Sequence, residues 1–219
     1  MRQFFNNNGV EVLGDAGWDL KRAEEEIRRH YRAQRGQYRY VIYKVVLGIN
    51  SIITKIFNPR ERRHDIVVRE VDISYIKRDV NGLFDIGRSR TGVMVSCAQI
   101  QGADIMKYYK YKAERKGPFR TRTSKEMQYR VEHRVKEMNK YIDRVNKEDT
   151  IRDYRGNKNI GDIVNSGKSK RKSGKKRWSI RYGRLYDGLH TNEDWSLKTA
   201  RKVIRSIRKE EGKIRERME

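Results

Sequence analysis

Apolar residues recur at helical spacing near the start of the chain. We expect a helix that begins at Asp15, a residue type that caps first turns, and ends near Gly36. Its apolar face carries Trp18, Leu20, Ala23, Ile27 and Tyr31. The first 14 residues read as a loose start.

Residues 38–57 are rich in β-branched and aromatic side chains. They fit either a continuing helix or a strand pair that turns near 48–51, and periodicity does not separate the two. Asn58 and Pro59 break the pattern. The most apolar window, Val41–Phe57, is interrupted by polar residues and is shorter than the ~20 residues that cross a bilayer. We therefore expect it in the core and expect no membrane span.

The next stretch predicts short strands. Residues 65–76 alternate between apolar and polar positions, and Asn81-Gly82 is a turn signal. Phe84–Ile86 and Val93–Cys97 are further strand candidates on either side of the polar sequence GRSRTG.

Two helices are expected after Gly102. The first covers 103–116 and ends before Gly117-Pro118, and the second covers 124–147. Thr123 and Glu126 have the spacing of a capping box. The second helix carries an apolar seam through 127–145, at steps of three and four residues from Val131 on. This seam predicts an intramolecular helix pair, with self-association as the alternative.

Residues 151–174 have the composition of a linker. Four glycines and several Asn and Ser residues lie between 150 and 174, with little to bury. We therefore expect an α+β fold with three parts: a mixed helical and short-strand body at 1–150, a flexible basic linker at 151–174, and a small basic β-β-α module at 175–219.

Within that module, residues 176–182 alternate as a strand and Gly183 marks a tight turn. Residues 184–190 are expected to return antiparallel, and Ser196 to cap a final helix. The stretches 173–182, 184–190 and 196–207 resemble the small sheet-plus-helix DNA-binding domains of tyrosine recombinases and ethylene-response-type transcription factors. The resemblance implies that the sheet enters the major groove. It turns Lys175, Arg177, Ser179, Arg181 and Arg184 toward DNA, and Trp178, Ile180 and Tyr182 toward the helix.

Positive charge is concentrated at this end of the chain. The net charge is +24 over 219 residues, and half of the excess lies in residues 152–219. Nine of the seventeen residues from Lys168 to Arg184 are Lys or Arg, and none is acidic. So large a positive excess favours nucleic acid as the partner over an acidic protein or an anionic membrane surface.

The expected phosphate contacts are basic residues in two places. GRSRTG at 87–92 is read either as a second phosphate-contacting loop or as a hairpin turn. The candidates are Lys168, Lys170, Arg171, Lys172, Lys175, Lys176, Arg177, Arg181 and Arg184, with Arg88 and Arg90 in GRSRTG.

Catalytic and metal-binding patterns are weak. The single cysteine, Cys97, excludes an internal disulfide, and the four histidines have no zinc-site spacing. The acidic residues Asp65, Glu70, Asp72 and Asp79 could hold Mg²⁺, but a solvated face explains them as well. His190 with Asp194 could form an acid–base pair or be a simple turn. YYKYK at 108–112 fits stacking on bases or partial burial equally.

The sequence thus predicts a non-enzymatic nucleic-acid-binding protein without metal or cofactor. It is expected in the cytoplasm or nucleus, because one cysteine and the lack of an apolar signal core do not suit a secreted protein. The alternatives are a recombinase- or nuclease-like DNA-processing protein, or an RNA-binding protein of ribosomes or viral genome packaging. DNA and RNA are not separated.

Overall fold

The computed structural model describes residues 2–15, 17–46, 49–60, 63–69, 72–90, 92–116, 125–148, 169–170, 176–177 and 184–218. Helices dominate these ranges, with three small strand pairs. The elements are α1 (Arg2–Asn6), α2 (Leu20–Gln34), β1 (Val41–Val45), α3 (Ile49–Ile52), β2 (Ile53–Asn58), β3 (Arg63–Val68), α4 (Ile73–Arg88), β4 (Val93–Cys97), α5 (Ile105–Lys116), α6 (Lys125–Glu148), β5 (Ser169–Lys170), β6 (Lys176–Arg177) and α8 (Glu193–Met218).

The centre of the fold is a parallel strand pair. β1 lies beside β4, with Val41 opposite Val93 and Val45 opposite Cys97. Parallel strands need a crossover, and the chain from β1 to β4 contains α4, which packs on β4. β2 and β3 pair antiparallel within the same connection. The expected mixture of helices and strands is confirmed, and the central pairing is of the parallel, α/β kind.

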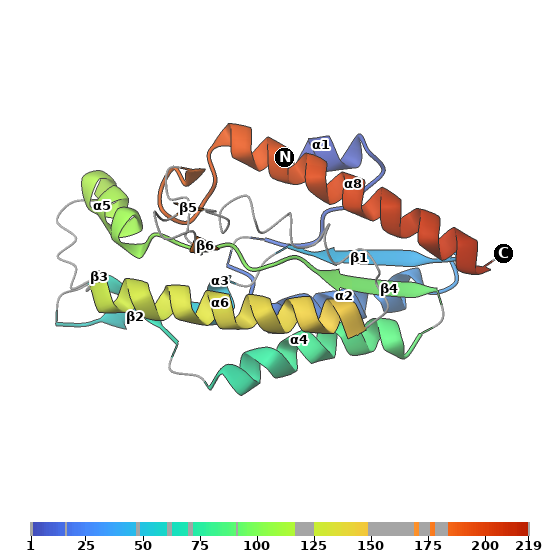
Figure 1. Cartoon of the computed structure of the whole chain (residues 1–219), viewed down its shortest axis with the longest axis horizontal. Helices are drawn as coiled ribbons and strands as arrows, with labels where there is room; N and C mark the ends of the chain where they lie inside the picture. The colour runs from blue at the N-terminus through green and yellow to red at the C-terminus, as the bar shows by residue number, and fades with distance from the viewer. Residues whose placement is uncertain are drawn as a thin grey trace.

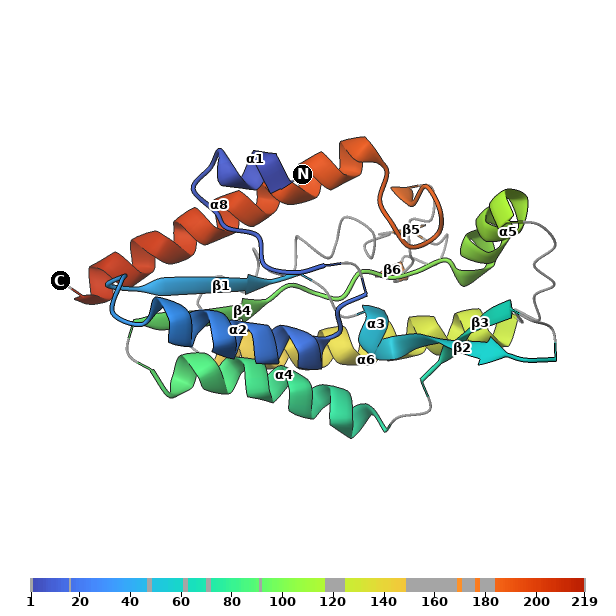
Figure 2. The same ribbon diagram turned by 180° about the vertical axis from the view of Figure 1, so that it is seen from behind.

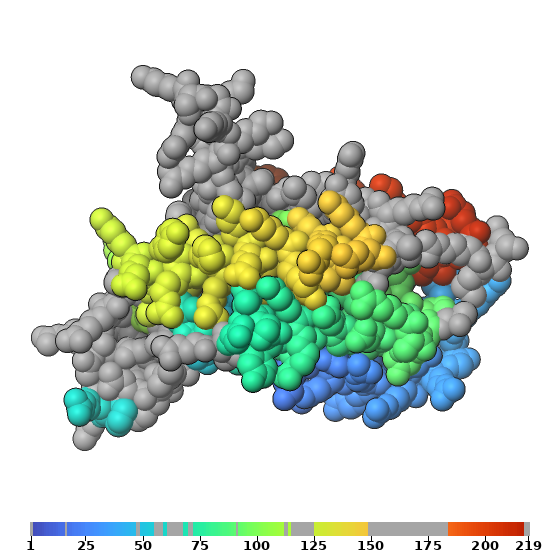
Figure 3. Space-filling model, turned by 60° about the horizontal axis from the view of Figure 1, so that its bottom comes forward, coloured from blue at the N-terminus to red at the C-terminus, as the bar shows by residue number. Residues whose placement is uncertain are grey.

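Helices cover both faces of this pair. α8 and the short α1 lie on one face, and α2, α4 and α6 lie on the other (Figures 1 and 2). The three helices of the second layer form one continuous surface in Figure 3. The core between the layers is centred on α4, where Val80, Leu83 and Phe84 are almost completely buried. No helix in the described ranges is long and apolar enough to span a membrane.

The first predicted helix is real but begins later than expected. The carboxylate of Asp19, not that of Asp15, accepts the hydrogen bond of the first turn from the Arg22 backbone N–H (2.9 Å). Asp15 instead forms an exposed ion pair with Arg2 (3.0 Å). Neither reading of residues 38–57 is right as stated. That stretch contains strand β1, helix α3 and strand β2, and the two strands pair with different partners.

The prediction for residues 65–86 is wrong beyond Val68. Asp72 caps helix α4 by accepting from the Ser74 backbone N–H (2.8 Å), so the expected strand at 73–76 and the strand at 84–86 are both helical. Asn81-Gly82 is not a turn. Apolar residues at helical spacing bury one face of α4, and this burial outweighs the local turn signal. A Cβ at Gly82 would meet only the carboxylate of Glu24 on α2, the flexible end of that side chain.

The later elements of the body follow the prediction. Val93–Cys97 is a strand, residues 105–116 and 125–148 are helices, and the α6 seam is buried inside the chain. Its members Val131, Val135 and Met138 are 0% exposed. This burial confirms the first of the two predictions, that the seam packs within the chain. Self-association through 127–145 stays a prediction, and it would require these side chains to leave the core.

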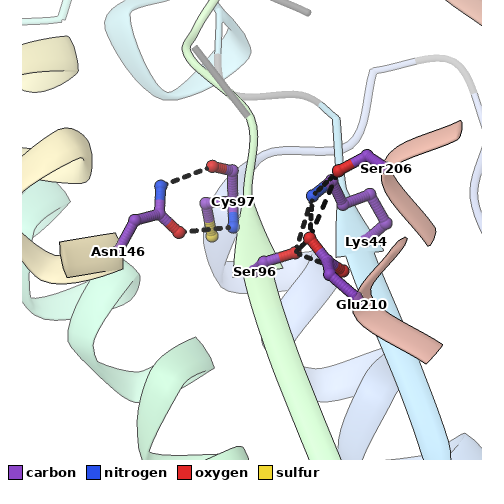
Figure 4. Close-up of polar contacts among 6 residues, drawn as sticks. All are labelled: Lys44, Ser96, Cys97, Asn146, Ser206 and Glu210. Atoms are coloured by element: carbon purple, nitrogen blue, oxygen red, sulfur yellow. Dashed lines mark hydrogen bonds and ion pairs between the residues drawn. The ribbon is translucent and has the colours of Figure 1, made fainter. Parts of the chain in front are cut away.

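Amide side chains of α6 hold the segment that follows β4. Asn146 donates to the Cys97 carbonyl (2.8 Å) and accepts from the Cys97 N–H (3.4 Å; Figure 4). Asn139 makes the same pair of bonds to Ile100, at 2.9 and 2.6 Å. Gln128 makes a similar pair of bonds, because it accepts from the Ile105 N–H and donates to the Ala103 carbonyl. These bonds satisfy buried backbone groups that a further strand would otherwise pair.

The C-terminal strands differ from the prediction. β6 pairs antiparallel with β5, and residues 184–190 form a compact loop in which Leu185 bridges to Thr191. Asn192, not Ser196, caps α8 by accepting from the Trp195 N–H (3.1 Å). Residues 178–183 lie outside the described residues. The domain boundaries at 150 and 175 stay predictions, while α8 itself packs on β1.

Candidate functional site

A buried ion pair fixes α8 to β1. The Lys44 ammonium donates to Glu210 Oε1 (2.6 Å), to Ser206 Oγ (2.8 Å) and to Ser96 Oγ (2.9 Å; Figure 4). The side chains of Lys44 and Glu210 are 2% and 0% exposed. Charges this deep are tolerated only when they are paired and hydrogen-bonded, and both conditions are met here.

A second anchor lies further along the same helix. The Tyr40 hydroxyl donates to Glu211 (2.9 Å) and accepts from Arg215 Nε (3.2 Å). The hydrogen bond from Tyr40, assisted by Arg215, lowers the pKa of the Glu211 carboxyl. Tyr40 comes before Lys44 in the chain, but its partner Glu211 comes after Ser206, a partner of Lys44, along α8. α8 therefore runs antiparallel to β1. The two anchors together fix which face of α8 is turned outward.

That outward face is cationic. Lys198, Arg201, Arg205 and Arg208 are exposed and follow one another at steps of three, four and three residues, so they form one line along the helix. We call these four residues the α8 stripe. No Asp or Glu occurs between Trp195 and Lys209. For Arg201 and Arg205, no ion pair with another described residue is found.

The cations of α2 provide a contrast. Arg22 lies 2.5 Å from Glu26, Arg28 lies 2.8 Å from Glu24, and Arg29 also contacts Glu26. Acidic neighbours one helical turn away thus neutralise much of the positive charge on α2. Arg201 and Arg205, in the middle of the α8 stripe, have no acidic residue one helical turn away, so their charge is available to an external anion.

Trp195 connects the stripe to the loop that precedes α8. The Arg184 guanidinium lies 3.7 Å from the centroid of the Trp195 ring, and the Lys198 ammonium lies 4.0 Å from it. Cations are attracted to the faces of an indole, so both are held in place. The cationic surface therefore extends from α8 into residues 184–191, which we call the α8 loop.

Within the α8 loop, a carboxylate orients an imidazole. Asp187 Oδ2 lies 2.8 Å from His190 Nδ1, and Asp187 Oδ1 accepts from the backbone N–H groups of Leu189 (2.9 Å) and His190 (2.7 Å). Burial raises the pKa of the Asp187 carboxyl, but the hydrogen bonds from His190 and Leu189 outweigh it, and the pKa is lowered. The Asp187 side chain is 4% exposed and that of His190 is 67% exposed.

The α8 loop sits beyond the carboxyl end of β4. The Asp104 N–H donates to the Gly188 carbonyl (2.7 Å), and Gln101 Nε2 donates to the Leu189 carbonyl (2.7 Å). Gly188 has φ +93°, a conformation that a side chain would strain. In α/β folds, ligands bind outside the carboxyl ends of the parallel strands, which is the position of this loop.

The predicted GRSRTG site is a helix-to-strand connection and not a hairpin turn. Arg88 ends α4 and forms an ion pair with Asp85 (3.1 Å). The Arg90 guanidinium lies 4.7 Å from the centroid of the Tyr31 ring and donates to the Ile86 carbonyl (3.4 Å). Both arginines thus already have partners inside the fold. Their role as phosphate contacts stays a prediction.

The remaining predicted phosphate contacts are only partly described. Lys170 is the backbone partner of Lys176, and Ser169 that of Arg177, so β5 and β6 bring basic residues into register. Arg184 stacks on Trp195, as described above. The other candidates lie outside the described residues: Lys168, Arg171, Lys172, Lys175 and Arg181.

Among the other sequence candidates, Glu70 lies outside the described residues, whereas Asp72 and Asp79 belong to α4. Asp72 is a helix cap, and the hydrogen bonds from Ser74 lower the pKa of its carboxyl. Asp79 lies on α4, where burial raises its pKa. No cluster of three potential metal ligands occurs in the part of the chain that is described. Tyr108 and Tyr109 are 5% and 4% exposed, so burial is the correct reading of these two residues of YYKYK.

The sequence signals for the α8 stripe and the Asp187–His190 pair were present but weak. Six cations without an acid between residues 195 and 209 mark the stripe, and a helical wheel places four of them in line. The spacing D-G-L-H is typical of an Asx turn that returns onto its own histidine. Of the two interpretations of His190, the turn is the one that the structure bears out, and the partner of the imidazole is Asp187 and not Asp194.

Comparisons with known protein families, with curated proteins and with solved structures find no match for this chain.

Proposed function

We propose that this chain binds nucleic acid, and that the α8 stripe forms part of the contact surface. The observation that carries the proposal is the line of exposed cations on α8 with no acidic residue among them. Phosphate groups of DNA or RNA attract Lys and Arg, and binding releases the condensed counterions of the nucleic acid. Such binding does not require recognition of the bases.

The dimensions of the stripe suit a phosphate backbone. From Lys198 to Arg208 the helix rises about 15 Å at 1.5 Å per residue. A duplex carries one negative charge per about 1.7 Å of its axis, so a stripe of this length faces several phosphates at once. Arg184, which lies on the face of Trp195, extends the positive surface beyond the N-terminal end of α8.

A salt titration of the full chain tests the proposal. Binding to a fluorescent RNA oligonucleotide and to a DNA duplex is measured between 50 and about 300 mM NaCl, where each phosphate contact contributes about −0.9 to the duplex slope. Four contacts predict a slope of about −3.6 or steeper. Absence of binding, or affinity that does not change with salt, contradicts the proposal. Deleting residues 168–219 is not a suitable test, because it removes Glu210 and leaves Lys44 unpaired in the core.

A second function is favoured by the Asp187–His190 pair. A carboxylate that binds Nδ1 holds an imidazole so that Nε2 can act as a general base. Nε2 would take a proton from water while the water oxygen bonds to an ester carbonyl carbon. The carbon–oxygen bond to the leaving group then breaks, and the leaving alkoxide recovers the proton from the imidazolium. This proposal is hydrolysis of an ester without a metal.

Chromogenic esters test the second function. The full chain is assayed with p-nitrophenyl acetate in metal-free buffer, next to His190→Ala and to His133→Ala, which changes an exposed histidine on α6. The proposal expects a rate that His190→Ala lowers by at least about a hundredfold, the lower end of the range for a positioned base, and that His133→Ala leaves unchanged. Equal rates for the three proteins contradict it.

A further inference from the structure

A cavity of about 480 Å³ lies between the N-terminal segment, α2, β1 and α8. Its volume falls within the range of small-molecule pockets, about 300–1,000 Å³. The wall is mostly apolar and draws side chains from all four parts of the chain. Examples are Leu13, Ile27, Ile42, Val45, Ala200 and Val203. The cavity is on the side of α8 that faces the sheet and is thus separate from the α8 stripe.

The charged groups in the wall already have partners within the protein. Lys44 contributes to the wall, but its ammonium is bound by Glu210, Ser206 and Ser96. Glu11, which is 68% exposed, lies 3.2 Å from His30 Nε2. An anionic ligand would therefore meet one carboxylate and a neutralised ammonium, which disfavours it.

Hydroxyl groups supply the polar part of the wall. Thr199 Oγ1 donates to the Trp195 carbonyl (2.8 Å), and Ser196 Oγ lies 2.6 Å from Thr191 Oγ1. Hydroxyls whose protons are engaged still accept hydrogen bonds. They can therefore accept a hydrogen bond from the hydroxyl group of a ligand alcohol, and no charge is buried when they do so.

We propose that this cavity binds a neutral, linear, apolar molecule that ends in a hydroxyl group, of the fatty-alcohol class. The apolar wall takes the chain, and the Thr191–Ser196–Thr199 group takes the hydroxyl. The proposal is independent of nucleic-acid binding, because the cavity and the α8 stripe are on opposite faces of α8.

Titration calorimetry with two probes of equal chain length tests it. The full chain is titrated with 1-decanol and with sodium decanoate, and tryptophan emission, to which Trp18 in the cavity wall contributes, is followed in parallel. The expected result is saturable binding of one decanol per chain and at least tenfold weaker binding of decanoate. The proposal is overturned if the unaltered chain does not bind decanol, or if it binds decanoate as tightly as decanol.

Two substitutions locate the probe. Ala200→Leu fills the cavity and is expected to weaken decanol binding at least tenfold. Ala33→Leu changes an exposed alanine on α2 outside the cavity and should leave binding unchanged. Ala23→Leu, also in the wall, replaces Ala200→Leu if circular dichroism shows that the latter does not fold. Full binding by the cavity-filling variant overturns the assignment of the site.

Discussion

Lys44 and Glu210 are 166 positions apart in the chain, yet their charged groups form a buried ion pair across β1 and α8. The pair joins the first strand of the parallel sheet to the last helix. It therefore determines the rotation of α8, and with it the face of the helix that carries the α8 stripe.

Removal of one partner of this pair should be far more costly than removal of both. Glu210→Ala leaves the Lys44 ammonium buried without its carboxylate, so the free energy of unfolding should fall by about 3–5 kcal/mol. The double variant Lys44→Met with Glu210→Leu should recover most of the loss. Urea denaturation of the three proteins measures this. A single variant as stable as the wild type would show that the pair is not buried in solution.

The hydrogen bonds that side-chain amides of α6 make to the backbone predict a second effect on stability. Asn139→Ala removes the two hydrogen bonds that this side chain makes to the backbone of Ile100 in the core, and a buried polar group that loses its partner costs about 1–3 kcal/mol. We expect a loss of about 2–4 kcal/mol and faster hydrogen exchange at the Ile100 amide. Asn7→Ala, at an exposed position, should change stability by less than about 0.5 kcal/mol. Unchanged Ile100 exchange in Asn139→Ala would contradict the contact.

The burial of Tyr43 predicts that the stability of the fold falls at alkaline pH. Burial, with Tyr31 and Glu11 nearby, raises the pKa of its hydroxyl to about 12. The unfolded chain loses this proton near pH 10. The stability that Tyr43 contributes is therefore complete below about pH 10 and lost as the pH rises through 12. Urea midpoints from pH 9 to 12.5 should fall more steeply for the wild type than for Tyr43→Phe, and parallel curves would disagree with this burial.

Gly188 makes a conformational prediction for the α8 loop. An added Cβ would collide with the Asp104 carbonyl and with the Tyr108 backbone, and φ is +93°. Gly188→Ala should thus displace the loop and break the Asp187–His190 hydrogen bond, which ¹⁵N NMR of the imidazole reports. Gly212→Ala on α8 meets open space and should gain up to about 1 kcal/mol. Retention of the His190 hydrogen bond in Gly188→Ala would exclude the strained geometry.

Local sequence signals predicted the elements whose apolar spacing was long and regular. The helix α6 is such a case, because it has one face buried in the core. The strand Val93–Cys97 was also predicted, although it is short and its last three residues are buried on both faces. They failed at α4, where Asn81-Gly82 imitates a turn but lies within a helix that has one buried face. The boundary at Asp19 was missed since Asp15 and Asp19 are both good caps, and only tertiary contacts choose between them.

The candidate site was less predictable than the fold. The density of positive charge drew attention to residues 168–184, of which few are described. The exposed stripe on α8 depends on the rotation of that helix, which is set by Lys44 and Tyr40 from the other end of the chain. Pairing between Asp187 and His190 depends on a Gly188 conformation that spacing alone does not specify.

The central claim is that the α8 stripe contacts nucleic acid, and matched charge removal tests it most directly. Arg201→Gln with Arg205→Gln removes two stripe cations, while Arg32→Gln with Arg35→Gln removes two exposed cations from the end of α2 and the turn after it. The account predicts that the stripe variant lowers the steepness of the duplex salt dependence by about 1.8, since each lost phosphate contact removes about 0.9. The control should keep the wild-type slope. Equal slopes for the two variants would contradict the account.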